Sequence, residues 1–142
     1  MALILDIADA IVGVLNEREF SADFIAERRY LPIFDLLEMK DLHVTVLMRS
    51  MVASASTKDG LADRDIKIDI AIQKKLLKIE EDYEVDDLMG LVDEIFLYLG
   101  SVDAFGPAWC RSIENSPAYL SEHLSTLRQF TSVITLSLKM IS

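Results

Sequence analysis

Three segments of the chain alternate between apolar and polar residues, which is the period of a half-buried β-strand. The clearest spans residues 65–73, and weaker examples span residues 41–49 and 130–140. Because only one face of each segment is apolar, antiparallel pairing with one solvated face is expected. In the first segment four isoleucines share a face: Ile66, Ile68, Ile70 and Ile72.

Two other segments repeat their apolar residues at three- and four-residue steps, which predicts amphipathic helices. The first covers about residues 3–17, and the second covers residues 85–99. Gly100 is placed to end the second helix in a left-handed cap. Gly90 lowers the stability of that helix relative to alanine, so a close approach of the helix to the sheet is expected there.

Two weaker strands and one long connection complete the pattern. Residues 22–30 have mixed faces, which is typical of an edge or interface strand. Residues 109–114 place Trp109, Arg111 and Ile113 on one side. Residues 50–64 show no period, so they are predicted to form a projecting loop between two hairpin neighbours.

The predicted order is helix, three strands, helix, two strands. Strands grouped apart from helices favour an α+β fold, with a mainly antiparallel sheet of about five strands and two helices packed on one face. No repeat or linker divides the chain, so residues 1–142 are expected to form a single domain. The four isoleucines should all lie beneath the two helices.

The composition supports a packed domain, because 51% of the 142 residues are hydrophobic and 27% are charged. The formal net charge of −10 disfavours a protein that grips nucleic acid by neutralising phosphates. A lone cysteine, Cys110, cannot form an intrachain disulfide. The N-terminus lacks the basic start of a signal peptide, and no apolar run is long enough to span a membrane, so a soluble, cytoplasmic protein is expected.

No catalytic, cofactor or metal site is predicted. His43 and His123 lack a ligand spacing and are interpreted as ordinary surface or hydrogen-bonded histidines. Asp63, Asp65 and Asp69 lack the calcium-loop pattern and are interpreted as a solvated strand face. Cys110 is expected to be buried. Glycine-rich phosphate loops and a nucleophile elbow are missing from the sequence.

An acidic run precedes and begins the second helix, with six acids in eight positions. It suits the positive end of the helix dipole, and it also suits an anionic patch that faces a basic partner or lines a passage. The two interpretations are compatible. The residues of this candidate acidic patch are Glu80, Glu81, Asp82, Glu84, Asp86 and Asp87.

Four segments, in this order, resemble the tail terminator (tail completion) proteins of long-tailed bacteriophages. They are the opening helix followed by FSADFIAERRYLPIFDLLEMKDLHVTVL, the strand DIKIDIAIQKKL, the helix EVDDLMGLVDEIFLYL, and the ending HLSTLRQFTSVITLSLKM. The resemblance implies a virion protein that assembles as a ring, typically a hexamer, on the head-proximal end of the tail tube. Such a ring ends tube polymerisation, joins the neck proteins and lets DNA pass without sequence-specific binding. No catalytic residues or cofactors are implied.

Ring subunits need two different contact patches, and the mixed-face strands supply candidates. The candidate subunit interface comprises Phe24, Glu27, Arg29, Tyr30, Trp109 and Arg111, and the candidate contact with tube or neck comprises Arg49, Lys58, Asp59 and Arg64. An excess of acid is expected to repel passing DNA. Three alternatives stay open: another head–tail connector or neck component, a small acid–base enzyme that uses clustered carboxylates, and a host adaptor domain.

Overall fold

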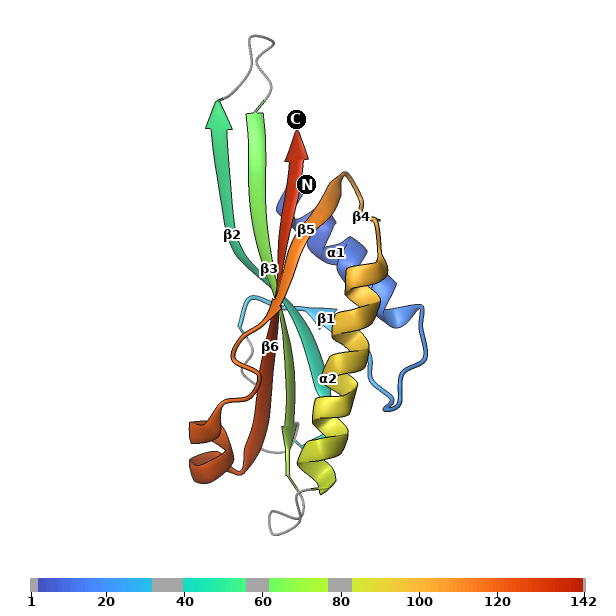
Figure 1. The fold of residues 1–142 in the computed structure, drawn as a ribbon, viewed down its shortest axis with the longest axis vertical. Coiled ribbons are helices and arrows are strands. Elements are labelled where there is room, and N and C mark those ends of the chain that lie inside the picture. The colour runs from blue at the N-terminus through green and yellow to red at the C-terminus, as the bar shows by residue number, and fades with distance from the viewer. Residues whose placement is uncertain (1–2, 32–39, 56–61, 77–82, 142) are drawn as a thin grey trace.

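The structure, a computed structural model, describes residues 3–31, 40–55, 62–76 and 83–141. It confirms the α+β class, with two main helices and a six-stranded sheet (Figure 1). The elements in chain order are α1 (Leu3–Asn16), β1 (Ala26–Arg28), β2 (His43–Ala55), β3 (Ala62–Lys75), α2 (Tyr83–Ser101), β4 (Ala104–Phe105), β5 (Ala108–Asn115), the π-helix η2 (His123–Leu127) and β6 (Gln129–Ile141).

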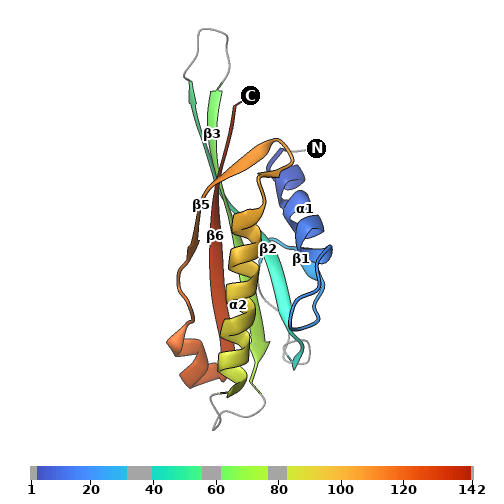
Figure 2. The same ribbon diagram turned by 45° about the vertical axis from the view of Figure 1, so that its right-hand side comes forward.

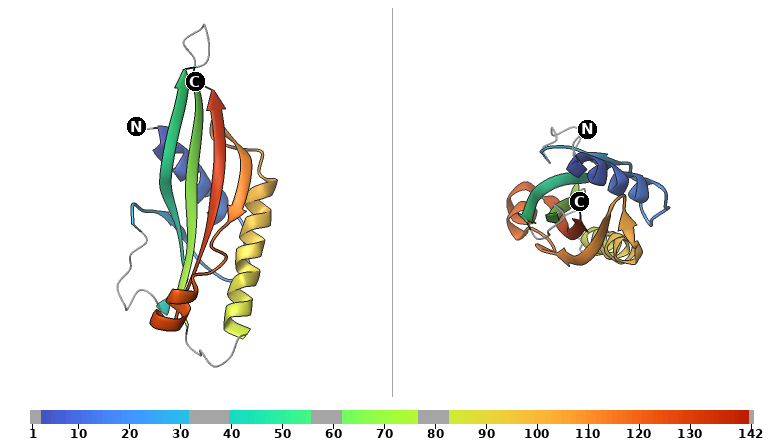
Figure 3. Two further views of the ribbon diagram at one scale, coloured as in Figure 1. Left: turned by 60° about the vertical axis from the view of Figure 1, so that its left-hand side comes forward. Right: turned by 90° about the horizontal axis from the view of Figure 1, so that it is seen from above.

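The strands lie in the order β1-β2-β3-β6-β5-β4. β1 is parallel to β2, and every other neighbouring pair is antiparallel. Both α1 and α2 lie on one side of the sheet, whereas η2 lies on the other (Figures 2 and 3). We call the side that faces α1 and α2 the inner face, and the opposite side the outer face.

The core forms between the inner face and the two helices. All four isoleucines of β3 are fully buried, as the alternation predicts. In the paired registers, Ile70 lies between Val46 of β2 and Ile134 of β6, and both of these neighbours are fully buried. Side chains from α1 and α2, such as Ile11 and Ile95, complete this core.

The predicted loop over residues 50–64 is wrong for the residues described there. β2 continues to Ala55 and β3 begins at Ala62, so the two strands form one long antiparallel ribbon that extends beyond the helices (Figure 1). A register shift between Met48 and Ser50 makes Arg49 an extra residue. Such a β-bulge reverses the alternation along the strand, which hides its period from sequence inspection.

The edge position predicted for residues 22–30 is confirmed, but the strand is limited to Ala26–Arg28. Asn16, at the end of α1, holds this strand by two hydrogen bonds to Ala26: its amide donates to the carbonyl over 3.1 Å, and its oxygen accepts from the N–H over 2.8 Å. The short β4 and the π-helix η2 carry no periodic pattern and were not predicted.

Both glycine predictions in α2 are wrong. The helix continues through Gly100 to Ser101, and the glycine with positive φ among the described residues is Gly106, in the turn between β4 and β5. Gly90 is exposed, and nothing lies within 4 Å of where a Cβ would stand. Helix–sheet contact therefore does not explain this glycine.

Candidate functional site

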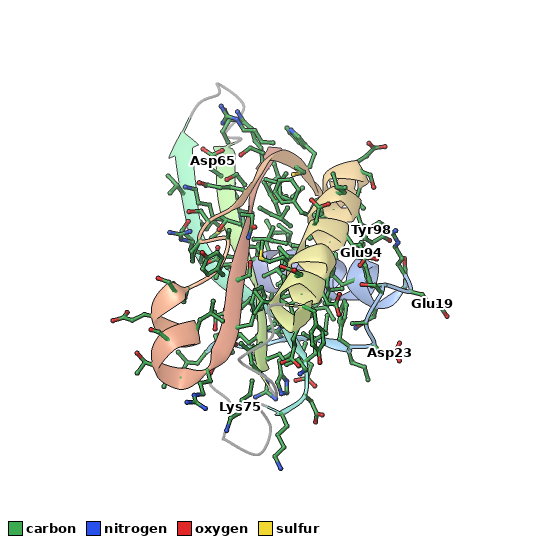
Figure 4. All side chains as sticks on the ribbon, turned by 60° about the horizontal axis from the view of Figure 1, so that its bottom comes forward. Glu19, Asp23, Asp65, Lys75, Glu94 and Tyr98 are labelled. Carbon is green, nitrogen blue, oxygen red and sulfur yellow. The ribbon has the colours of Figure 1, made fainter. Side chains whose placement is uncertain are left out.

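The upper half of the outer face, toward the top of Figure 1, is a ladder of paired charges. Three aspartates of β3 meet cations from β2, β6 and β5, as expected for a solvated strand face. Asp63 pairs with Lys139 at 3.8 Å, Asp65 with Arg111 at 3.8 Å, and Asp69 with Arg49 at 3.6 Å. Asp69 also accepts a hydrogen bond from Thr135 Oγ1 over 2.7 Å. Figure 4 shows Asp65 on this part of β3, away from α2.

Two bulges place arginines on either side of this ladder. Arg49 is the extra residue of β2, and Arg111 is the extra residue of β5, between Cys110 and Ser112. Between the bulges, one row crosses four strands and presents Ser50, Lys67, Ser137 and Ser112 to the outer face. A shallow hollow of about 370 Å³ opens along this row, beside Val52 and Asp65.

The bulge in β5 overturns the prediction that Trp109, Arg111 and Ile113 share one side. Trp109 lies opposite Lys139 on the outer face and is 41% exposed. Cys110 and Ile113 pack against the core, because the extra residue Arg111 reverses the alternation between them. Trp109 and Arg111 therefore remain available on the outer face, whereas Ile113 belongs to the core.

Each side of the sheet ends in a partly free strand edge. β1 covers only Val44–Val46 of β2, so residues 47–55 have no strand partner on that side among the described residues. This stretch includes the exposed Met51 and Val52. On the other side, β4 covers only Ala108 and Trp109, which leaves residues 110–115 of β5 without a strand partner within the described part of the chain. Unpaired edges are templates for another strand.

The predicted interface residues of the first edge separate into two groups. Phe24 stacks on Phe20, with ring centroids 5.4 Å apart, and packs against the core. Tyr30 is 75% exposed, beside the pair that Arg29 forms with Glu27 at 3.0 Å. Ile25 and Leu31 are exposed near them, although sequence reasoning did not select them. The apolar surface at β1 therefore depends on Ile25, Tyr30 and Leu31 rather than on Phe24.

Two residues of the candidate contact with tube or neck, Arg49 and Arg64, lie on strands of the sheet. Arg49 is the bulge residue of β2, and Arg64 belongs to β3, opposite Ala53 and Met140. Opposite residues share a face, so Arg64 lies on the inner face and Arg49 on the outer face. Lys58 and Asp59 lie outside the described residues.

The described part of the candidate acidic patch begins α2. Glu84 is mostly buried and lies 3.8 Å from Lys74 Nζ, while Asp86 and Asp87 are exposed. The remaining three acids, Glu80, Glu81 and Asp82, lie outside the described residues. The exposed pair lies in the first turns of the helix, where the helix dipole favours negative charge.

Sequence reasoning missed a clamp that fixes the segment between α1 and β1 to α2. Glu94 accepts hydrogen bonds from the hydroxyl and the backbone N–H of Ser21. The Arg18 guanidinium lies over the rings of Phe20 and Tyr98, 5.1 and 4.8 Å from their centroids. Figure 4 shows Glu94 and Tyr98 on the side of α2 toward this segment. Ser21 and Glu94 lie 73 positions apart, so no local pattern could have revealed the clamp.

The candidate chemical residues have structural surroundings. Cys110 is partly buried, and this burial raises the pKa of its thiol, against a smaller lowering by a backbone hydrogen bond from Ser112. His123 Nδ1 lies 2.9 Å from Thr131 Oγ1. The described residues contain no group of three or more side chains placed to hold a metal ion. Within the described ranges, neither helix is both long and apolar enough to cross a membrane.

Comparison with known proteins assigns no family, because no protein-family model and no curated protein matches the chain. Function is therefore inferred from the surfaces described above.

Proposed function

We propose that this chain is a non-enzymatic virion assembly protein that forms a ring, similar to the tail terminators of long-tailed bacteriophages. In this role it caps the head-proximal end of the tail tube, ends tube polymerisation and joins the tail to the neck. The observation that carries the proposal is an open sheet with a different free strand edge on each side. The order of helices and strands that suggested the resemblance supports it as well.

Two unlike edges favour head-to-tail association. A contact between different patches of identical copies is heterologous, and it generates a ring when the rotation closes. β2, β3, β6 and β5 alternate in direction, so β2 and β5 run oppositely. The free edge of β5 in one copy can therefore pair antiparallel with the free edge of β2 in the next copy. Rotation about a ring axis parallel to the strands keeps every strand direction, so the same contact can repeat around the ring.

The free edges also carry side chains suited to an interface. Val52 is 61% exposed on the free edge of β2, and Trp109, next to the free edge of β5, is 41% exposed on the outer face. Large apolar and aromatic side chains at the centre of an interface contribute most of its binding energy.

Edge substitution combined with electron microscopy tests the proposal. We expect the protein, alone or mixed with purified tail tubes, to form rings and to cap one end of each tube. Val52→Lys should abolish rings, because an edge lysine opposes strand pairing. Leu97→Lys is the matched control, since Leu97 is 63% exposed on a helix rather than on a strand edge, and it should leave rings intact.

Three outcomes would count against the proposal. Uncapped tubes with a monomer at every concentration would exclude the terminator role. Binding to portal-side neck proteins but not to tubes would favour a connector. Rings that survive Val52→Lys but are lost in Leu97→Lys would place the contact on the helices instead of the sheet edges.

A further inference from the structure

The lower half of the outer face, toward the bottom of Figure 1, is covered by the chain itself. Residues 116–128, which we call the strap, connect β5 to β6 and include η2 on the side opposite α1 and α2 (Figures 1 and 2). Asp65 and Lys67 are exposed on this face, but Ala71 and Gln73, farther along the same face of β3, are buried. The outer face thus has an open half and a covered half.

The strap is attached mainly by polar contacts. None of its residues is buried, and Leu124 is its side chain that packs against the core. Three backbone bonds join it to the sheet: the N–H of Leu120 to the carbonyl of Thr131 over 2.9 Å, that of Val133 to Pro117 over 3.2 Å, and that of Leu76 to Arg128 over 2.9 Å. The His123–Thr131 contact is a fourth attachment. Segments with few buried apolar contacts open at lower free energy than the core.

Two features of the closed strap oppose closure. Gln73, which lies opposite Thr131, is 5% exposed, and its side-chain oxygen has no hydrogen-bond partner among the described residues. A buried acceptor without a partner destabilises the state that buries it. Arg128, where the strap meets β6, has a φ of 55°, a left-handed conformation that strains a non-glycine residue.

We propose that the strap is a releasable cover that opens as one unit while the sheet stays folded. Opening hydrates Gln73, relaxes Arg128 and joins the lower outer face to the open upper half. Within the assembly role proposed above, on which this functional consequence rests, opening gives an incoming partner the whole outer face, so the closed strap restrains assembly. The strap's mobility itself is a property of the isolated chain.

Amide hydrogen exchange of the isolated protein, resolved by NMR, tests this inference. The reporters are the three amides bonded across the strap, those of Leu76, Leu120 and Val133, and the reference is the central amide of Ile70. We expect the reporters to exchange at similar opening free energies, about 100-fold or more faster than the reference. Reporters that exchange as slowly as Ile70 would refute the strap as an independent unit.

Substitutions separate the strap from general loosening. Gln73→Met removes the unpartnered oxygen and should slow the reporters about tenfold, whereas Thr131→Val removes an attachment and should accelerate them. Thr126→Val makes the same chemical change at an exposed position of η2 and should have little effect. Equal effects of the two threonine substitutions would refute the attachment. These results do not depend on rings, so failure of ring formation alone would count against the proposed function and not the strap.

Discussion

The burial of Ile70 gives the most direct test of how the sheet and helices pack. Its side chain is fully buried, and its cross-strand neighbours, Val46 and Ile134, are fully buried too. Replacement by alanine removes three carbons from a site with packed neighbours on both strands, so the cavity should collapse only in part. The expected loss in the free energy of unfolding is about 2–5 kcal/mol, against about 5–15 kcal/mol for a whole domain.

Thermal and urea unfolding, monitored by circular dichroism, measure this loss in the free energy of unfolding. Ile70→Val should cost about 0.5–1.5 kcal/mol, which calibrates the series. Lys67→Ala, on the opposite face of the same strand, should change stability by no more than about 0.5 kcal/mol. Equal losses for Ile70→Ala and Lys67→Ala would show that β3 does not have one buried and one solvated face, and the division into inner and outer faces would then be incorrect.

Three further perturbations test local interactions. Asn16→Ala should lower the free energy of unfolding by about 1–3 kcal/mol in urea titrations, because the N–H and carbonyl of buried Ala26 lose their partners; a change near zero would contradict this. Glu94→Ala should release Ser21 and increase proteolysis within residues 17–23, with less than about 1 kcal/mol lost because the contact is exposed; unchanged cleavage would refute the clamp. Burial raises the pKa of Cys110, so its alkylation should be slower than that of free cysteine at neutral pH. Because the pKa of the thiol is higher in the folded protein than in the unfolded chain, the stabilising contribution of the protonated thiol is fully present below the pKa of the unfolded thiol and is lost as pH rises through the pKa of the folded one. Cys110→Ser should abolish this pH dependence of the free energy of unfolding.

The sequence predicts those parts of the fold in which period and burial agree. The isoleucine alternation identifies β3 and its buried face, and helical spacing identifies α1 and α2 within a few residues. Prediction fails where the chain departs from regular geometry. Arg49 and Arg111 are extra residues in their strands, and each shifts the alternation by one position, so the end of β2 resembles a loop and Ile113 is assigned to the wrong face.

Candidate surfaces are less predictable than the core because they depend on contacts between distant segments. Trp109 and Arg111 were selected from the sequence and do lie on the outer face. Phe24 was selected on the same grounds, but its ring turns inward to Phe20. Phe24 lies before β1, which begins at Ala26, so a strand period does not set the direction of its side chain.

The distribution of charge decides which face suits a DNA passage. α2 contains five acids and no basic residue, whereas the upper outer face pairs its aspartates with Arg49, Arg111 and Lys139. A ring that turned α2 toward its centre would repel phosphates through the carboxylates of this helix. A ring that turned the outer face inward would expose arginines to the DNA. Each of these guanidinium groups is already paired with a carboxylate, so it would attract phosphate less. A net charge of −10 therefore does not by itself predict the field inside a ring, because the excess acid lies largely with the helices.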